Sequence, residues 1–221
     1  MRKLSPLLLS LILFAPIVGA QSLSEADIRK LLARIAERRA SAPDVRADFQ
    51  EQKRIHLLNR PIVSSGKIWF HAPNKFRREV AGNSSSVAVS NGRDIWIYYP
   101  NFKSAEHYAL GKRSPVDAVI AAINTGLNLE NVENTFRITG AKIDTGYDLQ
   151  LLPRSPSMKR MFQKFDLRLN GDLVAERTDM IQPNGDQVIT TYSNQTRATI
   201  PAATFEFTPP TGTAISTPLG R

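Results

Sequence analysis

The first strongly periodic segment of the chain predicts an amphipathic helix. Ser24 followed by Asp27 resembles a capping box, which predicts the start of the helix, and Pro43 predicts an end near Ser41. The opposite face carries charged side chains, and we interpret it as solvated rather than membrane-bound, because soluble amphipathic helices commonly have such a face. The apolar positions recur at i, i+3, i+4 and i+7 and are Ile28, Leu31, Leu32 and Ile35.

From Val45 the pattern changes to a period of two, which is typical of half-buried β-strands. Asn-Gly dipeptides at 91–92, 170–171 and 184–185 separate several of these segments, and Asn-Gly favours the tight turns of β-hairpins. Consecutive antiparallel strands are therefore predicted through most of the chain. The predicted strands are 45–50, 65–71, 75–80, 86–90, 94–99, 106–110, 135–138, 147–152, 161–169, 173–181, 187–192 and 204–207.

A second helix is predicted between the two runs of strands. Ser114 is followed by Pro115 at the first helical position, and Gly126 is a typical stop. The segment is nearly all apolar, so it must pack on an apolar surface. Its main face is formed by Val116, Val119, Ile120 and Ile123. The whole pattern predicts a mainly β, α+β fold: a strongly curved antiparallel sheet, forming an open and incomplete barrel, covered by helical lid segments.

The first twenty residues have the pattern of a cleaved secretion signal. Arg2 and Lys3 precede an apolar run over 4–18, which is followed by the small residues Gly19 and Ala20. The run is shorter than the ~20 residues that span a bilayer. We therefore expect 1–20 to be a signal peptide removed near Ala20 and 21–221 to form a single domain. The sequence has no cysteine, so we expect neither a disulfide nor an acylated N-terminal cysteine.

Charge and candidate chemistry narrow the functional classes. The formal net charge is +9, and loss of Arg2 and Lys3 lowers it by two. The basic residues are scattered and form no recognised nucleic-acid motif, so we expect no nucleic-acid partner. His56, His71 and His107 are far apart in sequence and cysteine is absent, so we expect no metal site. No lipase elbow or phosphate-binding glycine loop occurs, which predicts no cofactor and no catalytic residue, and makes binding in an apolar concavity the default.

Several segments carry a resemblance to a known family. They read VRADFQEQ at 45–52, SGKIWF at 65–70, PNKF at 73–76, VSNGRDIWIYYP at 89–100 and FEFTPPTG at 205–212. In order and spacing they resemble LolA, the periplasmic outer-membrane lipoprotein carrier family, and segment 57–66 is similar to its divergent LolA-like branch. The resemblance implies an unclosed barrel whose apolar concave face, covered by helices, holds the acyl chains of a lipoprotein.

The resemblance, together with strand parity, assigns candidate sites but no catalytic residue. We expect the two apolar helix faces named above to form the lid. We expect Gly66 to face the cavity together with the lining residues. The alternative reading is that the lining residues merely fill a core. The expected lining residues are Phe49, Ile68, Phe70, Phe76 and Val80.

One departure from the family pattern concerns the lid. Many LolA proteins carry an arginine just before the proline that ends the Gly-x-Leu-Trp strand, where it holds the lid closed, but this chain has Ala72. Arg78 is inward by parity, at a position where an aromatic side chain is more usual. Because a buried arginine needs a partner, we expect Arg78 to act as a lid latch that bonds lid carbonyls and replaces the missing contact.

The resemblance also implies partners. We expect a monomeric periplasmic carrier that accepts acylated lipoproteins from an inner-membrane transporter and passes them to an outer-membrane acceptor. A carrier of a glycolipid or other acylated small molecule is an alternative, and a lipid-sensing envelope regulatory module is another. A lipid-processing enzyme is disfavoured by the missing nucleophile elbow.

Overall fold

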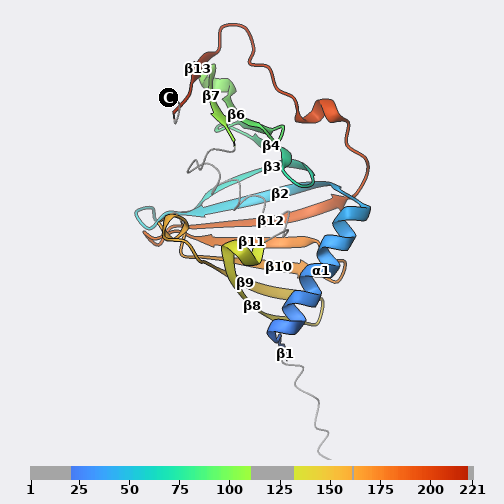
Figure 1. Ribbon diagram of the computed structural model, residues 1–221. Coiled ribbons are helices and arrows are strands. Elements are labelled where there is room, and N and C mark those ends of the chain that lie inside the picture. The colour runs from blue at the N-terminus through green and yellow to red at the C-terminus, as the bar shows by residue number, and fades with distance from the viewer. Residues whose placement is uncertain (1–20, 111–131, 161, 219–221) are drawn as a thin grey trace, which may run out of the picture.

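The computed structural model describes residues 21–110, 132–160 and 162–218 (Figure 1). The expected signal peptide lies outside the described residues, as does the expected helix after Ser114 with Val116, Val119, Ile120 and Ile123. The helices of the described part are α1 (Glu25–Ser41), η1 (Pro100–Phe102), α3 (Val132–Thr135), α4 (Pro156–Lys159) and η2 (Ala202–Phe205).

The described strands form one open sheet of 13 strands, in the order β1-β8-β9-β10-β11-β12-β2-β3-β4-β5-β6-β7-β13. Neighbouring strands are antiparallel, except that β13 runs parallel to β7. The sheet is strongly curved (Figure 1), which confirms the predicted fold class. The strands are β1 (Gln21–Ser22), β2 (Asp44–Arg54), β3 (Ile62–His71), β4 (Lys75–Ala81), β5 (Ser86–Ser90), β6 (Asp94–Tyr99), β7 (Ser104–Ala109), β8 (Phe136–Ile143), β9 (Gly146–Pro153), β10 (Lys164–Asn170), β11 (Ala175–Ile181), β12 (Gln187–Thr196) and β13 (Ala214–Ser216).

Helix α1 begins and ends where the sequence predicts. The Ser24 side chain accepts a hydrogen bond from the Asp27 amide, and the Asp27 carboxylate accepts one from the Ser24 amide, each at 3.2 Å. This capping box satisfies amides that the helix itself leaves unpaired. The apolar face of α1 packs on β8 to β11 (Figure 1). Together they bury a core of Ile28, Leu31, Leu32, Ile35, Val132, Phe136, Leu149, Leu151, Met158, Phe162, Phe165, Leu167, Leu169, Leu173 and Ala175.

Strand register shows that this core and the other half of the sheet share a face. Leu167 is paired with Thr178, Thr178 with Thr190, and Thr190 with Glu51. Directly paired residues point to the same side of a sheet. We call the side that α1 covers the inner face. On β2 to β7 it includes the row Ala47, Ile68, Arg78, Ala88, Ile97 and Glu106.

The last part of the chain covers the outer face of β3 to β7. We call residues 197–216 the C-terminal strap; Figure 1 shows it leaving β12, passing η2 and ending as β13. The Ile200 amide donates to the Asp44 carboxylate at 2.9 Å, and Phe207 packs against Trp96 and Tyr98 with ring centroids 6.0 and 5.7 Å apart. The strap therefore covers apolar side chains of the outer face, and the large apolar surface that it does not cover on β2 to β7 is the inner face.

The predicted strand at 204–207 is wrong. Residues Ala202–Phe205 form the 3-10 helix η2, in which the Thr204 amide donates to the carbonyl of Pro201 at 2.9 Å. Phe205 then packs against His71 on the outer face, with ring centroids 6.1 Å apart. The alternation Phe-Glu-Phe arises here because aromatic rings face the sheet from a strap that lies over it.

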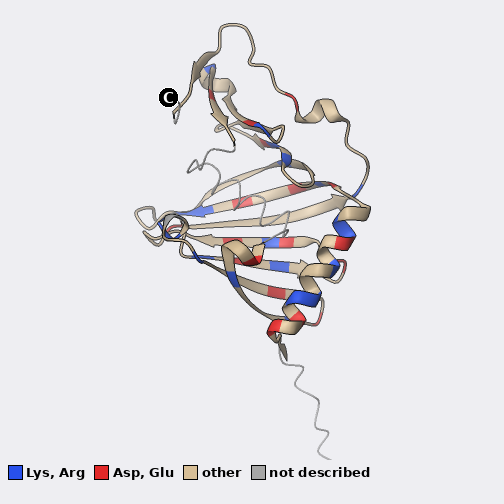
Figure 2. Ribbon diagram, viewed as in Figure 1, with Lys and Arg blue, Asp and Glu red and all other residues tan. Residues whose placement is uncertain are grey.

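Charged side chains of both signs are interspersed along α1 and the strands (Figure 2). Many pair across neighbouring strands of the outer face, as Lys67 does with Asp48 at 2.6 Å and Arg168 with Asp148 at 2.7 Å. Opposite charges placed directly across a strand pair stabilise a sheet modestly. The outer face of the sheet is thus polar where the strap does not cover it.

Candidate functional site: the inner face of strands β2 to β7

An apolar cluster lines the inner face of β2 to β6. Most of its members are the inward-facing residues of three consecutive strands, β2, β3 and β4. Val80, Ala88, Ile97 and Tyr108 pack against the cluster and remain partly exposed. The structure thus brings the predicted lining residues together: Phe49, Ile68, Phe70 and Phe76 are buried in it, and Val80 lies beside it. Whether they line a ligand cavity stays a prediction. The cluster consists of Val45, Ala47, Phe49, Ile68, Phe70, Phe76 and Ile95.

A glycine allows the ring of Phe49 to lie against the sheet. Gly66 is the direct cross-strand partner of Phe49, and a Cβ on Gly66 would lie 2.8 Å from the Phe49 ring and 1.8 Å from the Glu79 carbonyl oxygen. The guanidinium carbon of Arg78 lies 4.1 Å from the centre of the same ring. A cation at this distance is attracted to the face of the ring. Gly66, Phe49 and Arg78 therefore form a stack at the centre of the inner face.

The Arg78 guanidinium has a carboxylate partner that the sequence analysis missed. Its Nη2 donates to Glu51 Oε2 at 2.7 Å, and the two side chains are 21% and 11% exposed. Glu51 follows Phe49 by two residues, so strand parity could have placed it on the inner face. The partner shown for Arg78 is thus Glu51 of the sheet, and its expected contact with the lid helix, which lies outside the described residues, stays a prediction.

Two tyrosines add hydroxyl groups to the same face. The Tyr108 hydroxyl donates to Glu106 at 2.5 Å. Burial, and then this carboxylate, raise the pKa of the Tyr108 phenol. Burial likewise raises the pKa of Tyr192, partly opposed by hydrogen bonding with Thr178. Both phenols are therefore neutral hydrogen-bonding groups at neutral pH, suited to binding a polar group.

Comparison with known proteins decides the family. The model of the family described as "Outer membrane lipoprotein carrier protein LolA" matches residues 41–208, which is most of the chain. The chain belongs to the LolA family. The match covers the strands that carry the inner face, from β2 to β12.

Curated relatives of this LolA-family chain are named outer-membrane lipoprotein carrier proteins. One from Coxiella burnetii is 22% identical over 207 residues, which cover 93% of each chain. Another, from Methylibium petroleiphilum, is 28% identical over 67% of this chain and 70% of its own length. Among solved structures, an uncharacterized conserved protein of Thermus thermophilus shares the fold, with a TM-score of 0.53 and 12% identity over 86% of this chain and 98% of that chain.

The four apolar residues predicted for the lid face of α1 lie in the core over β8 to β11. Ile28, Leu31, Leu32 and Ile35 are between 2% and 9% exposed there. That core is separate from the inner-face cluster of β2 to β6, although Tyr192 packs against both. The C-terminal turn of α1 comes closer, because Arg39 places its guanidinium carbon 5.9 Å from the ring centre of Phe70. Any lid movement of α1 stays a prediction.

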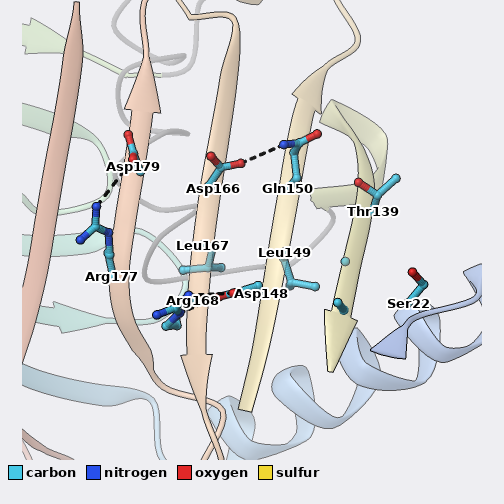
Figure 3. Close-up of a pocket in the computed structure, with 12 residues that line it drawn as sticks. Ser22, Thr139, Asp148, Leu149, Gln150, Asp166, Leu167, Arg168, Arg177 and Asp179 are labelled. Atoms are coloured by element: carbon cyan, nitrogen blue, oxygen red, sulfur yellow. Dashed lines mark hydrogen bonds and ion pairs between the residues drawn. The ribbon is translucent and has the colours of Figure 1, made fainter. Parts of the chain in front are cut away.

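A hollow of about 560 Å³ lies on the outer face of β8 to β11 (Figure 3). Its polar side chains are paired with one another: Arg168 holds Asp148 through two hydrogen bonds of 2.7 and 2.8 Å, and Gln150 donates to Asp166 at 3.2 Å. These groups project outward from neighbouring strands (Figure 3). A surface whose charges are already paired offers little to an acyl chain, so the inner face is the better candidate site.

Within 21–110, 132–160 and 162–218, no group of three or more His, Cys, Asp or Glu side chains is placed to hold a metal ion. In the same part of the chain, no helix combines the length and the hydropathy needed to cross a bilayer.

Proposed function

We propose that this protein is a periplasmic carrier that shelters lipoprotein acyl chains on the inner face of β2 to β7 and conveys them from the inner to the outer membrane. The observation that carries the proposal is the continuous apolar cluster of that face, in a chain of the LolA family. Its donor is an inner-membrane transporter and its recipient an outer-membrane acceptor. Residues 1–20 direct export and are removed near Ala20.

The energetics of this task explain why an apolar face suffices without catalytic residues. Each methylene that leaves water contributes ~0.8 kcal/mol, so one chain of about 16 carbons gains about 13 kcal/mol. In the described state Phe70 and Phe76 are each 1% exposed. Loading therefore requires a change of conformation that exposes the inner face to the acyl chains. Release requires that the acceptor bind the carrier preferentially in the conformation in which this face is buried.

Co-purification tests the proposal. The chain, expressed with residues 1–20 in a Gram-negative host, is isolated from the periplasmic fraction, and bound molecules are identified by mass spectrometry. We expect acylated proteins, and an intact mass that begins at Gln21. Val80 and Val87 give matched variants, because both are half-buried valines on adjacent strands but face the inner and outer sides respectively.

The variants are Val80→Glu and Val87→Glu. A carboxylate on the inner face opposes acyl burial, so Val80→Glu should reduce the amount of bound acylated protein several-fold while Val87→Glu retains it. Circular dichroism checks that both variants are folded. Equal loading of the two folded variants, or an absence of acylated protein from the wild-type chain, would contradict the proposal.

A second candidate function, a carrier of a glycolipid or other acylated small molecule, is favoured by one observation. The inner face carries a charged pair, Glu51 and Arg78, together with the hydroxyls of Tyr108 and Tyr192. Such groups hydrogen-bond sugars as well as peptides. The same mass spectrometry separates the two functions, since free glycolipid in place of acylated protein would favour the second.

A further inference from the structure

Arg39 is a partly buried cation with no ion-pair partner among the described residues. It lies in the last turn of α1, and its Nη1 atom is buried and makes no hydrogen bond. None of the ion pairs found in the described part of the chain includes it. Its guanidinium lies instead near the ring of Phe70, a wall of the inner-face cluster.

The described residues around Arg39 supply no negative charge. It lines a narrow pocket with Val45 and Ala47 of β2, Tyr192 of β12, and Arg197. No acidic residue is among the described residues that line this pocket. Burial, and then the charge of Arg197, lower the pKa of Arg39 to about 10, so it stays charged at neutral pH. A cation left unpaired in such a place is costly for the folded protein.

Carboxylates on adjoining elements are already engaged. Asp172 lies 3.7 Å from Arg38, Glu51 pairs with Arg78, and Asp44 accepts from the Ile200 amide and lies 2.7 Å from His71. The Arg197 guanidinium donates to the Arg38 carbonyl at 3.2 Å, which holds a second cation beside the pocket. The described residues thus concentrate positive charge at this point of the inner face, and none of their carboxylates pairs with Arg39.

We propose that Arg39, with Arg197 beside it, binds an anionic group, a phosphate or carboxylate, at the polar end of an acylated passenger. This inference rests on the proposed function, because the acyl chains would lie on the cluster that Phe70 closes. The pocket has a volume of about 10 Å³, which is room for about one water-sized group and suits one oxygen of the anion. A guanidinium donates charge-assisted hydrogen bonds to an oxygen of either group.

The test compares amphiphiles of one chain length and different head groups. Dodecyl phosphate, dodecanoate and uncharged dodecyl glucoside compete for the full exported chain against N-phenyl-1-naphthylamine, an uncharged fluorescent probe. We expect the wild-type chain to bind one or both anionic amphiphiles about tenfold more tightly than the glucoside, as a charge-assisted hydrogen bond of this kind implies. The comparison of phosphate with carboxylate identifies the source of the anion.

The matched variants are Arg39→Gln and, on the same helix, Lys30→Gln at an exposed position. We expect Arg39→Gln to abolish the preference for anionic head groups and to leave glucoside binding within about twofold, while Lys30→Gln keeps the preference. An unchanged preference in folded Arg39→Gln overturns the inference, as does wild-type binding that ignores head-group charge. Tight binding of inorganic phosphate alone assigns the site to a free anion and also overturns it. If no amphiphile binds, the proposed function itself fails.

Discussion

The Glu51–Arg78 ion pair allows a sharp test of how the inner face is stabilised. Glu51→Gln keeps the shape of the side chain but removes its charge, which leaves Arg78 largely buried without a carboxylate. Loss of one partner from a buried pair costs about 3–5 kcal/mol. Arg78 is 21% exposed and keeps its stack on Phe49, so we expect the lower part of that range, a loss of about 3 kcal/mol in the free energy of unfolding.

The assay is urea denaturation followed by circular dichroism, with two comparisons. Asp148→Asn removes the partner of Arg168 in a more exposed pair with the same shortest distance and should cost at most about 1 kcal/mol. The double variant Glu51→Met, Arg78→Met replaces both charges by apolar groups and should recover most of the lost stability. A loss in Glu51→Gln no greater than that in Asp148→Asn, or a double variant less stable than the single one, would refute the reasoning.

Three further predictions concern local features. Gly66→Ala should lower the free energy of unfolding by about 3 kcal/mol or more, measured by urea denaturation, because its Cβ would meet the Glu79 carbonyl. Ser24→Ala should cost about 1 kcal/mol in the same assay through loss of the α1 cap. Hydrogen bonds from His56 lower the pKa of Asp186, so their stabilisation is present above the ordinary carboxyl pKa and is lost as the pH falls through the lowered value; denaturation across acidic pH should show this dependence weakened in Asp186→Asn.

Local alternation predicted most strands because each inward position needs an apolar side chain. It set β4, β5 and β6 to within one residue, and the capping box set the start of α1. It failed where pairing depends on distant residues. The short strands β1 and β13 have no alternation of their own and exist because β8 and β7 offer them an edge.

The candidate site likewise combines features that local sequence predicts with contacts that depend on residues far apart in the chain. Strand parity, together with the family resemblance, placed Phe49, Ile68 and Phe70 on one face, because one face of β2 and β3 repeats every second residue. The pairing of Arg78 with Glu51 depends on the register of three strands and on the packing of the Phe49 ring against Gly66, so sequence could not supply it. Contacts of this kind are set by how strands align, which alternation does not specify.

Arg39 did carry a local signal. It follows Ile35 by four residues and so continues the buried stripe of α1, where a charged side chain contradicts the pattern. Arg78 is likewise a charged residue at an inward position of β4, and it forms an ion pair with Glu51. The two guanidiniums share the inner face and its apolar surroundings, yet only one of them has a carboxylate in the described structure. That difference is what directs Arg39 toward a ligand, because Glu51 pairs with Arg78 on this face while no carboxylate of the described residues pairs with Arg39.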